Sequence, residues 1–231
     1  MKLDAQTQEN IKRKIGERAA SFVEEGMLVG LGTGSTSTYF IRSLIKRCQE
    51  GLKVHVVSSS NRSLHLAVEG GIPTVDMNQV TDIDLTIDGA DEIDPKNRMV
   101  KGGGGAHTRE KILATSSKKM LVIVDESKLV EVLGKFGVAI EILPFGRKAT
   151  LAKLRKIGYE GKMRTQESGE FTLTDNGNYL FDIHSPTHFP TPEEDHKKII
   201  EITGVVETGF FFDLPLKVLV GYKDGTVALR R

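Results

Sequence analysis

Residues 27–37 read Met-Leu-Val-Gly-Leu-Gly-Thr-Gly-Ser-Thr-Ser, and this stretch decides the predicted fold. Its first five residues form a short apolar run, which is typical of a buried strand. A glycine-rich turn follows, and a helical pattern begins where the turn ends. A strand that leads through a tight turn into a helix is the repeating element of a parallel sheet covered by helices.

The same alternation continues on both sides of this stretch. Residues 11–25 have helical spacing and stop at Gly26. Further strands are predicted at 54–57, 84–87 and 120–124, and further helices at 63–69 and 108–116. The sequence therefore predicts an α/β fold whose parallel sheet carries helices on both faces.

The pattern changes after about residue 135. Residues 149–157 and 193–202 read as helices, and Asp175-Asn176-Gly177-Asn178 predicts a hairpin between 171–174 and 179–183, because Asn-Gly supports positive φ angles. A second hairpin is predicted within 218–228. We expect residues 136–209 to form a small α+β domain, and residues 1–135 and 210–231 to form the larger one.

Composition limits the possible partners. The 231 residues suffice for one large domain or for a domain with a smaller companion, and 39% of them are hydrophobic. The 32 basic and 31 acidic residues nearly cancel, so net charge gives no argument for binding nucleic acid or an anionic membrane. Any anion must be held by a local site.

Cysteine content and hydropathy bear on location. Cys48 is the only cysteine, so the chain has no intrachain disulfide framework, which fits a reducing compartment. The N-terminal residues lack an apolar signal core, and no stretch approaches the length of a membrane span. We therefore expect a cytoplasmic location.

The glycine-rich turn at residues 30–38 is a candidate phosphate site. Helix N-terminal amides favour anions, and the hydroxyls of Thr33, Ser35 and Thr36 add donors. A Walker loop would need lysine where Ser35 stands. A dinucleotide fingerprint would need a third glycine there and an acid after the next strand, where the sequence reads Ser58-Ser59-Ser60-Asn61. Both nucleotide interpretations fail, while a turn without any ligand stays open.

Residues 84–94 end a predicted strand in a cluster of carboxylates. Carboxylates crowded at a strand end repel one another unless a cation or a shared proton intervenes, so either a divalent metal or the nearby Lys101 could stabilise them. Lys101 precedes four consecutive glycines, residues 102–105, whose flexibility is entropically unfavourable. We expect the bare backbone of this loop to approach a ligand and its amides to bind an oxyanion.

The helix that follows offers two titratable side chains. Glu110 lies in its first turns, where a glutamate is often only a dipole-favoured surface residue. His107 is more typical of a cap or a packed residue than of a ligand. His184 and His188 are four residues apart, but Pro186 breaks the helical spacing that a metal pair would use.

Taken together, these motifs resemble those of the ribose-5-phosphate isomerase A family. They are residues 30–36, 88–92, 101–104, 108–111, 133–136 and 174–178 in that order. The resemblance covers nearly the whole chain. It implies a Rossmann-like, mostly parallel sheet domain with a second, smaller α+β domain. It also implies an aldose–ketose isomerase that interconverts D-ribose 5-phosphate and D-ribulose 5-phosphate, without metal or organic cofactor, as a homodimer or homotetramer.

Carried over by position, the resemblance implies a role for each motif. Glu110 would be the general base and Lys101 the electrostatic stabiliser, while Asp88 and Asp91 would orient the sugar and assist ring opening. The substrate-binding residues would be Thr33, Gly34, Ser35, Thr36, Gly89, Ala90, Gly102, Gly103, Gly104 and Lys128, with Lys12 near the phosphate. His107 and Gly105 depart from the family, which often has an apolar residue and alanine at these positions.

Three other functions compete with the isomerase. A non-catalytic sugar-phosphate sensor would need an output module, for which the length leaves no room. A metal-dependent hydrolase would use Asp88, Asp91 and Asp94. An acyl-transfer enzyme of related architecture would need a nucleophile motif that the sequence does not show.

Overall fold

The computed structural model describes residues 5–230, and the chain divides into two compact units. The first contains residues up to Ala90, Arg109–Lys128 and the segment from Leu214 onward; the second contains Asp91–Thr108 and Leu129–Asp213. Segments 91–108, 129–135 and 210–213 therefore belong to the second unit, whereas the sequence pattern predicted them in the larger domain. Over the described residues, no helix is both long enough and apolar enough to cross a membrane.

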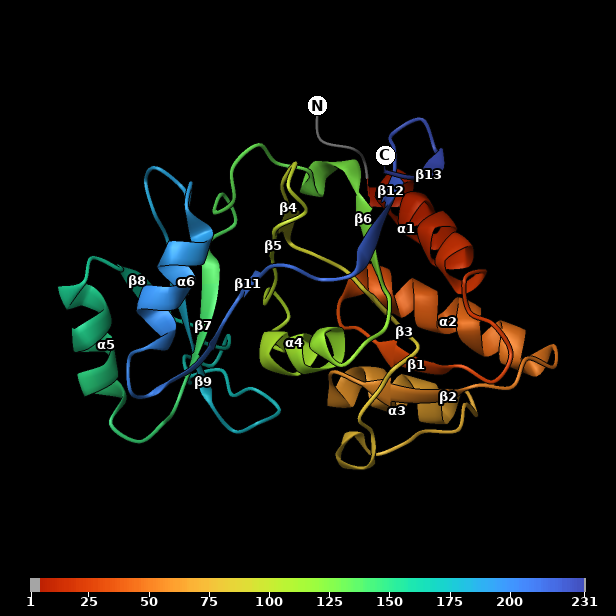
Figure 1. Cartoon of the computed structure of the whole chain (residues 1–231), viewed down its shortest axis with the longest axis horizontal. Coiled ribbons are helices and arrows are strands. Elements are labelled where there is room, and N and C mark those ends of the chain that lie inside the picture. Colours follow the sequence, from red (N-terminus) through yellow and green to blue (C-terminus); the bar gives the residue numbers. More distant parts are fainter. Residues whose placement is uncertain (1–4, 231) are drawn as a thin grey trace. The chain divides into compact units, whose positions relative to one another are not determined.

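The first unit is built on a six-stranded sheet (Figure 1). Its strand order is β13 (Val227–Leu229), β12 (Leu216–Gly221), β6 (Met120–Asp125), β3 (Leu85–Asp88), β1 (Leu28–Leu31) and β2 (His55–Ser58). All neighbours pair in parallel except β12 and β13, the predicted C-terminal hairpin. The prediction of an α/β fold with a mostly parallel sheet is confirmed.

Helices cover both faces of this sheet. Helices α1 (Ala5–Ala20) and α2 (Ser35–Gln49) pack on the face to which Val29 and Leu31 point. Successive strand residues face opposite sides, so Leu28 points the other way, where it packs with Leu113 of α4 (His107–Thr115). Helix α3 (Asn61–Glu69) packs on β2 and α2, and the short helices η1 (Met77–Gln79) and η2 (Glu126–Lys128) complete the unit.

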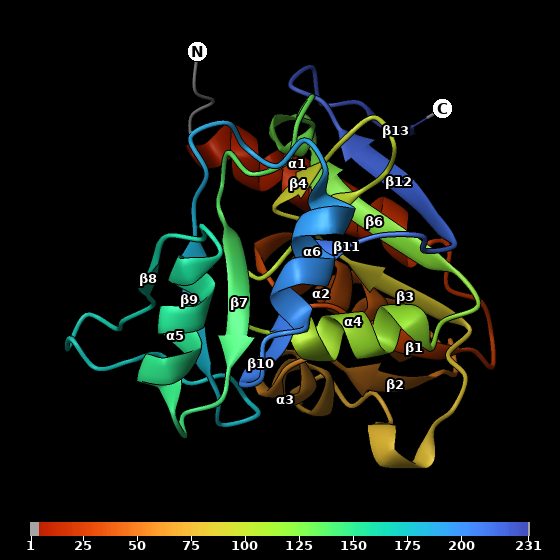
Figure 2. The same cartoon turned by 60° about the vertical axis from the view of Figure 1, so that its left-hand side comes forward.

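The second unit contains two antiparallel sheets. One has the order β10 (Val205–Thr208), β7 (Val138–Ile142), β9 (Tyr179–Ile183) and β8 (Gly161–Met163), and α5 (Arg147–Lys156) and α6 (Pro192–Ile200) lie along it (Figures 1 and 2). The other has the order β11 (Phe210–Phe211), β5 (Met99–Val100) and β4 (Glu92–Ile93). Val100, Leu133 and Phe210 share one buried core with β7 and α5, which is why their segments belong to this unit.

The predicted hairpin around Asn176-Gly177 forms only in part. The turn is present, with Gly177 at φ 76° and its amide donating to Thr174 O at 2.9 Å. Residues 171–174 pair across the turn only through an isolated antiparallel bridge between Leu173 and Tyr179, and they form no continuous strand. Leu173 is 57% exposed, and a segment that buries so little apolar surface gains little from joining the sheet.

Candidate active site

The glycine-rich turn between β1 and α2 is held by hydroxyl groups. Gly34 caps α2 at a φ of 119°, a conformation that favours glycine. The Thr33 hydroxyl lies 2.8 Å from the hydroxyls of both Ser59 and Ser60, and Ser63 donates to Gly32 O at 2.8 Å. The turn is thus fixed before any ligand arrives, and the first amides of α2, at Ser35 and Thr36, lie where a helix binds anions.

Asp88 is bound to this same turn. Its side chain is 1% exposed, and Oδ1 accepts from the amides of Thr33 (3.0 Å) and Gly89 (2.7 Å) and from the Ser37 hydroxyl (3.2 Å). A Cβ on Gly32 would lie 1.9 Å from the same oxygen, so only glycine fits there. Asp88 and the predicted phosphate turn therefore form one preorganised assembly.

Glu110 is a buried side chain. It lies in the first turn of α4 and is 4% exposed, which excludes the alternative that it is a surface residue. Asp88 and Thr86 point to the sheet face that α4 covers, and Thr86 Oγ1 lies 2.6 Å from Ser117 Oγ, just beyond the helix. The packing of Leu113 and this hydrogen bond fix α4 on the sheet, and with it the position of Glu110.

Three further predicted residues lie in the same unit. Ala90 follows Asp88 and Gly89 at the end of β3, and Lys128 is partly exposed at the end of η2. Lys12 is partly exposed on α1.

The second unit holds Lys101 and the glycine loop. Lys101 is 3% exposed; its amide donates to Gly209 O at 2.8 Å, and its Nζ lies 5.6 Å from the Phe211 ring centroid. Asp91 Oδ2 accepts from the Gly103 amide at 2.7 Å. Within this unit the structure therefore brings Asp91 together with the loop that Lys101 begins.

Three of the four glycines have a geometric reason. Gly102 and Gly105 have φ angles of 111° and 77°, and the Gly105 amide closes the turn on Gly102 O at 2.9 Å. A Cβ on Gly103 would lie 2.7 Å from Asp91 Oδ1. The loop thus needs bare backbone for its own conformation and for close approach of a carboxylate.

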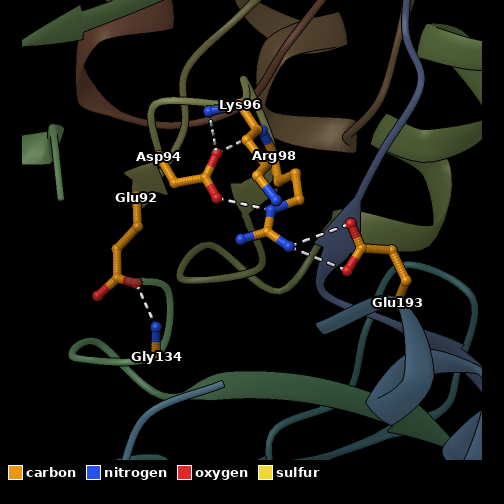
Figure 3. A network of polar contacts seen from close by, with 6 residues as sticks. All are labelled: Glu92, Asp94, Lys96, Arg98, Gly134 and Glu193. Atoms are coloured by element: carbon orange, nitrogen blue, oxygen red, sulfur yellow. Dashed lines mark hydrogen bonds and ion pairs between the residues drawn. The ribbon is translucent and has the colours of Figure 1, made fainter. Parts of the chain in front are cut away.

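The crowded carboxylates each have their own donors. Glu92 accepts from the amides of Gly134 and Phe136, both at 2.5 Å (Figure 3 shows the first). Asp94 accepts from Arg98 Nε at 2.6 Å, and Arg98 extends to Glu193 at 3.0 Å (Figure 3). Among residues 5–230, no group of three or more acids, histidines or cysteines is arranged to hold a metal ion.

Sequence reasoning missed a buried carboxylate that contacts the start of α4. Glu141 is fully buried on β7 and accepts from Thr108 at 2.5 Å, Thr174 at 2.9 Å and Asn178 at 2.8 Å. Burial by itself would raise the pKa of Glu141, but these hydrogen bonds and one from Asn176 outweigh it and lower the pKa. Glu141 lies within an apolar strand, where the sequence pattern does not indicate a functional carboxylate. Only the motif at 174–178, which supplies three of its donors, could have drawn attention to this region.

His107 precedes Thr108 and is fully buried, with Nε2 3.3 Å from Glu207 O. A Cβ on Gly102 would lie 3.1 Å from its Nδ1, so the ring packs directly behind the glycine loop. The interpretation of His107 as a packed residue agrees with this position.

Comparison with known proteins decides the family. Residues 55–225 match the profile of ribose 5-phosphate isomerase A (phosphoriboisomerase A). The chain belongs to this family. The isomerase A of Chlamydia felis is 48% identical over 219 residues, which cover 94% of each chain.

Solved structures agree with this isomerase in fold. Ribose 5-phosphate isomerase from Plasmodium falciparum superposes with a TM-score of 0.92 at 37% identity, covering 96% of this chain and 98% of that one. A D-ribose-5-phosphate isomerase in complex with phospho-erythronic acid gives 0.90 at 35% identity, with coverage of 96% and 98%. The predicted family, fold class and aldose–ketose isomerase class are confirmed, and these relatives give no support to the sensor alternative.

Proposed function

We propose that this isomerase interconverts D-ribose 5-phosphate and D-ribulose 5-phosphate through an enediolate, with Glu110 as the base. The observation that carries the proposal is the burial of Glu110 in the first turn of α4, on the sheet face to which Asp88 points. A buried carboxylate on this face has no packing role that an apolar side chain could not fill better.

The proposed reaction moves one proton between neighbouring carbons. Glu110 removes the proton from C2 of the open-chain aldose, and the electron pair shifts to place negative charge on the C1 oxygen. The protonated Glu110 then returns the proton to C1, while the proton of the C2 hydroxyl passes to the C1 oxygen, so that C1 becomes the alcohol and C2 the ketose carbonyl. General base catalysis of this kind contributes about two to four orders of magnitude in rate. No external oxidant or reductant is consumed, so the chemistry requires no cofactor.

The developing oxygen charge needs donors that are already in place. We assign this task to Lys101 and to the amides of Gly102 and Gly104, since preorganised donors stabilise an oxyanion without reorganisation. The amide of Gly103, also part of the proposed substrate site, holds Asp91 in place. Asp88 and Asp91 would hold the sugar hydroxyls and assist ring opening. Both carboxylates are held by backbone amides, so they can act as fixed acceptors.

The phosphate would bind at the N-terminus of α2. Backbone amides of Gly34, Ser35 and Thr36 and the hydroxyls of this turn are the proposed donors, with Lys128 adding positive charge and Lys12 nearby. Binding energy from this remote group orients the reacting carbons. The relative that binds phospho-erythronic acid supports a sugar-phosphate ligand here, because that acid also carries a phosphate on a polyol chain.

The proposal extends to the setting of the enzyme. We propose a cytoplasmic homodimer or homotetramer without metal, nucleic acid or membrane partners. The single cysteine supports the cytoplasmic location, and the balanced charge supports the absence of nucleic acid and membrane partners.

The decisive experiment is the substitution Glu110→Gln. It keeps the size of the side chain and removes the base, so kcat should fall by about two to four orders of magnitude while inorganic phosphate still inhibits with unchanged affinity. Glu69→Gln, which changes an exposed glutamate of the same unit, is the control and should leave kcat unchanged. Near-normal turnover of the Glu110 variant would reject Glu110 as the base.

Two further arms separate the alternatives. Activity of the wild-type protein should survive exhaustive treatment with a chelator; loss that added divalent metal restores would favour metal-dependent chemistry. Binding of ribose 5-phosphate without any ketose formation would favour the sensor.

A further inference from the structure

Arg164, which no motif pointed out, contacts the glycine loop. It follows β8, and its backbone amide donates to Leu180 O of β9 at 2.9 Å. Its Nη1 donates to Gly102 O at 2.8 Å and to Gly103 O at 3.2 Å. One guanidinium thus binds two successive carbonyl groups of the loop that the proposed function uses for oxyanion stabilisation.

Asp182 fixes the guanidinium itself. Arg164 Nε donates to Oδ2 at 2.9 Å and Nη2 donates to Oδ1 at 2.5 Å, which is a bidentate pair. Asp182 lies on β9, and β8 and β9 are paired, so both partners come from one antiparallel ladder. Bidentate pairs restrict orientation as well as distance. The third nitrogen of the fork is therefore aimed at the loop by regular secondary structure.

The carbonyl contacts determine where the loop amides point. In a trans peptide the C=O and the following N–H point in opposite directions. The peptide between Gly102 and Gly103 is held on both sides. Arg164 donates to its carbonyl oxygen, Gly102 O, and Asp91 accepts from its N–H, on Gly103, at 2.7 Å. In the next peptide, between Gly103 and Gly104, the carbonyl oxygen of Gly103 accepts from Arg164. The N–H of this peptide, on Gly104, therefore points away from the guanidinium.

This orientation matters because glycine has little intrinsic preference for any one backbone conformation. Gly103 and Gly104 are exposed, and a run of glycines samples many backbone conformations when nothing holds it. Arginine suits this task because its planar fork presents several donors at fixed angles, whereas lysine presents a single flexible ammonium group.

We propose that Arg164, oriented by Asp182, is a positioning residue for isomerisation. It holds the peptide planes that follow Gly102 and Gly103, so that Asp91 keeps the Gly103 N–H and the Gly104 N–H is directed at the developing oxyanion. This inference rests on the proposed function, in which the loop amides stabilise the enediolate. Arg164 itself touches loop carbonyls and takes no part in proton transfer.

The kinetic test uses Arg164→Lys, with Arg98→Lys as the matched control. Arg98 also forms ion pairs with two acids in the same unit, Asp94 and Glu193, but contacts another loop. Arg164→Lys should lower kcat by about 10²-fold, the effect of misplacing catalytic groups by about 1 Å, with KM for ribose 5-phosphate nearly unchanged. Inhibition by phospho-erythronic acid, whose carboxylate carries negative charge as the enediolate does, should weaken far more than inhibition by inorganic phosphate. Arg98→Lys should lower thermal stability and leave kcat intact.

A second measurement tests the loop directly and does not depend on turnover. Amide hydrogen exchange at Gly103 should accelerate in Arg164→Lys and in Asp182→Asn, while exchange at Ile140 in β7 stays unchanged. Failure of the wild-type protein to isomerise would count against the proposed function alone. The role of Arg164 would be overturned by either of two results. One is an unchanged rate of amide exchange at Gly103, and the other is a loss of kcat in Arg164→Lys no larger than that in Arg98→Lys.

Discussion

Replacement of Glu141 by glutamine is the most informative test of how the second unit is stabilised. The side chain is fully buried on β7, and four side-chain donors converge on it. Three of them, from Thr174, Asn176 and Asn178, approach Oε1, and Thr108 approaches Oε2. One carboxylate therefore connects the hairpin loop at 174–178 to the first turn of α4.

The expected magnitude follows from that geometry. Glutamine can keep its oxygen on the side of the three donors, but its NH₂ group then faces Thr108, whose hydroxyl must rotate to accept. Hydrogen bonds to a charged group contribute about 1.5–3 kcal/mol each, and neutral ones about 0.5–1.5 kcal/mol. Loss of the charge should thus lower the free energy of unfolding by about 2–4 kcal/mol.

The loss should depend on pH. The pKa of Glu141 is lowered in the folded protein from its ordinary value of 4.5, so ionisation favours the folded state. That contribution is fully present above pH 4.5 and disappears as the pH falls through the folded pKa. The difference between wild type and Glu141→Gln should therefore be largest near neutral pH and smaller in acid.

Urea denaturation at several pH values between 7 and 3 measures this difference. Glu167→Gln, at an exposed position of the same unit, is the control and should change stability by less than about 0.5 kcal/mol. If the deficit of Glu141→Gln stayed constant or grew as the pH fell, the assignment of a stabilising buried carboxylate would be refuted.

Two further substitutions test local geometry. Gly32→Ala places a methyl group 1.9 Å from Asp88 Oδ1 and should lower the melting temperature and turnover together; Gly89→Ala, whose nearest neighbour would be 3.7 Å away, should leave the melting temperature unchanged. Equal melting temperatures for the two variants would contradict the close approach. Tyr159→Phe removes the 2.7 Å hydrogen bond to Asp195 and should reduce stability in urea by about 0.5–1.5 kcal/mol, whereas an unchanged midpoint would show that the bond contributes nothing.

Local chemistry allowed much of the fold to be predicted from sequence. The apolar run at 27–31, the turn after it and the Asn176-Gly177 turn depend on backbone angles and periodicity that neighbouring residues alone dictate. The strand–helix alternation gave the parallel sheet for the same reason. The segment 171–174 forms no continuous strand because it pairs with β9 through a single bridge and leaves Leu173 exposed.

The sequence by itself determined which residue types were present for the chemistry: a carboxylate, a lysine, bare glycine backbone and a hydroxyl-rich turn. Only the tertiary structure decided their surroundings. It buried Glu110, gave each crowded acid its own donors, and brought Arg164 to Gly102, 62 residues away along the chain. Such partners come from distant strands whose packing is cooperative, and no local pattern encodes the pairing of two residues so far apart.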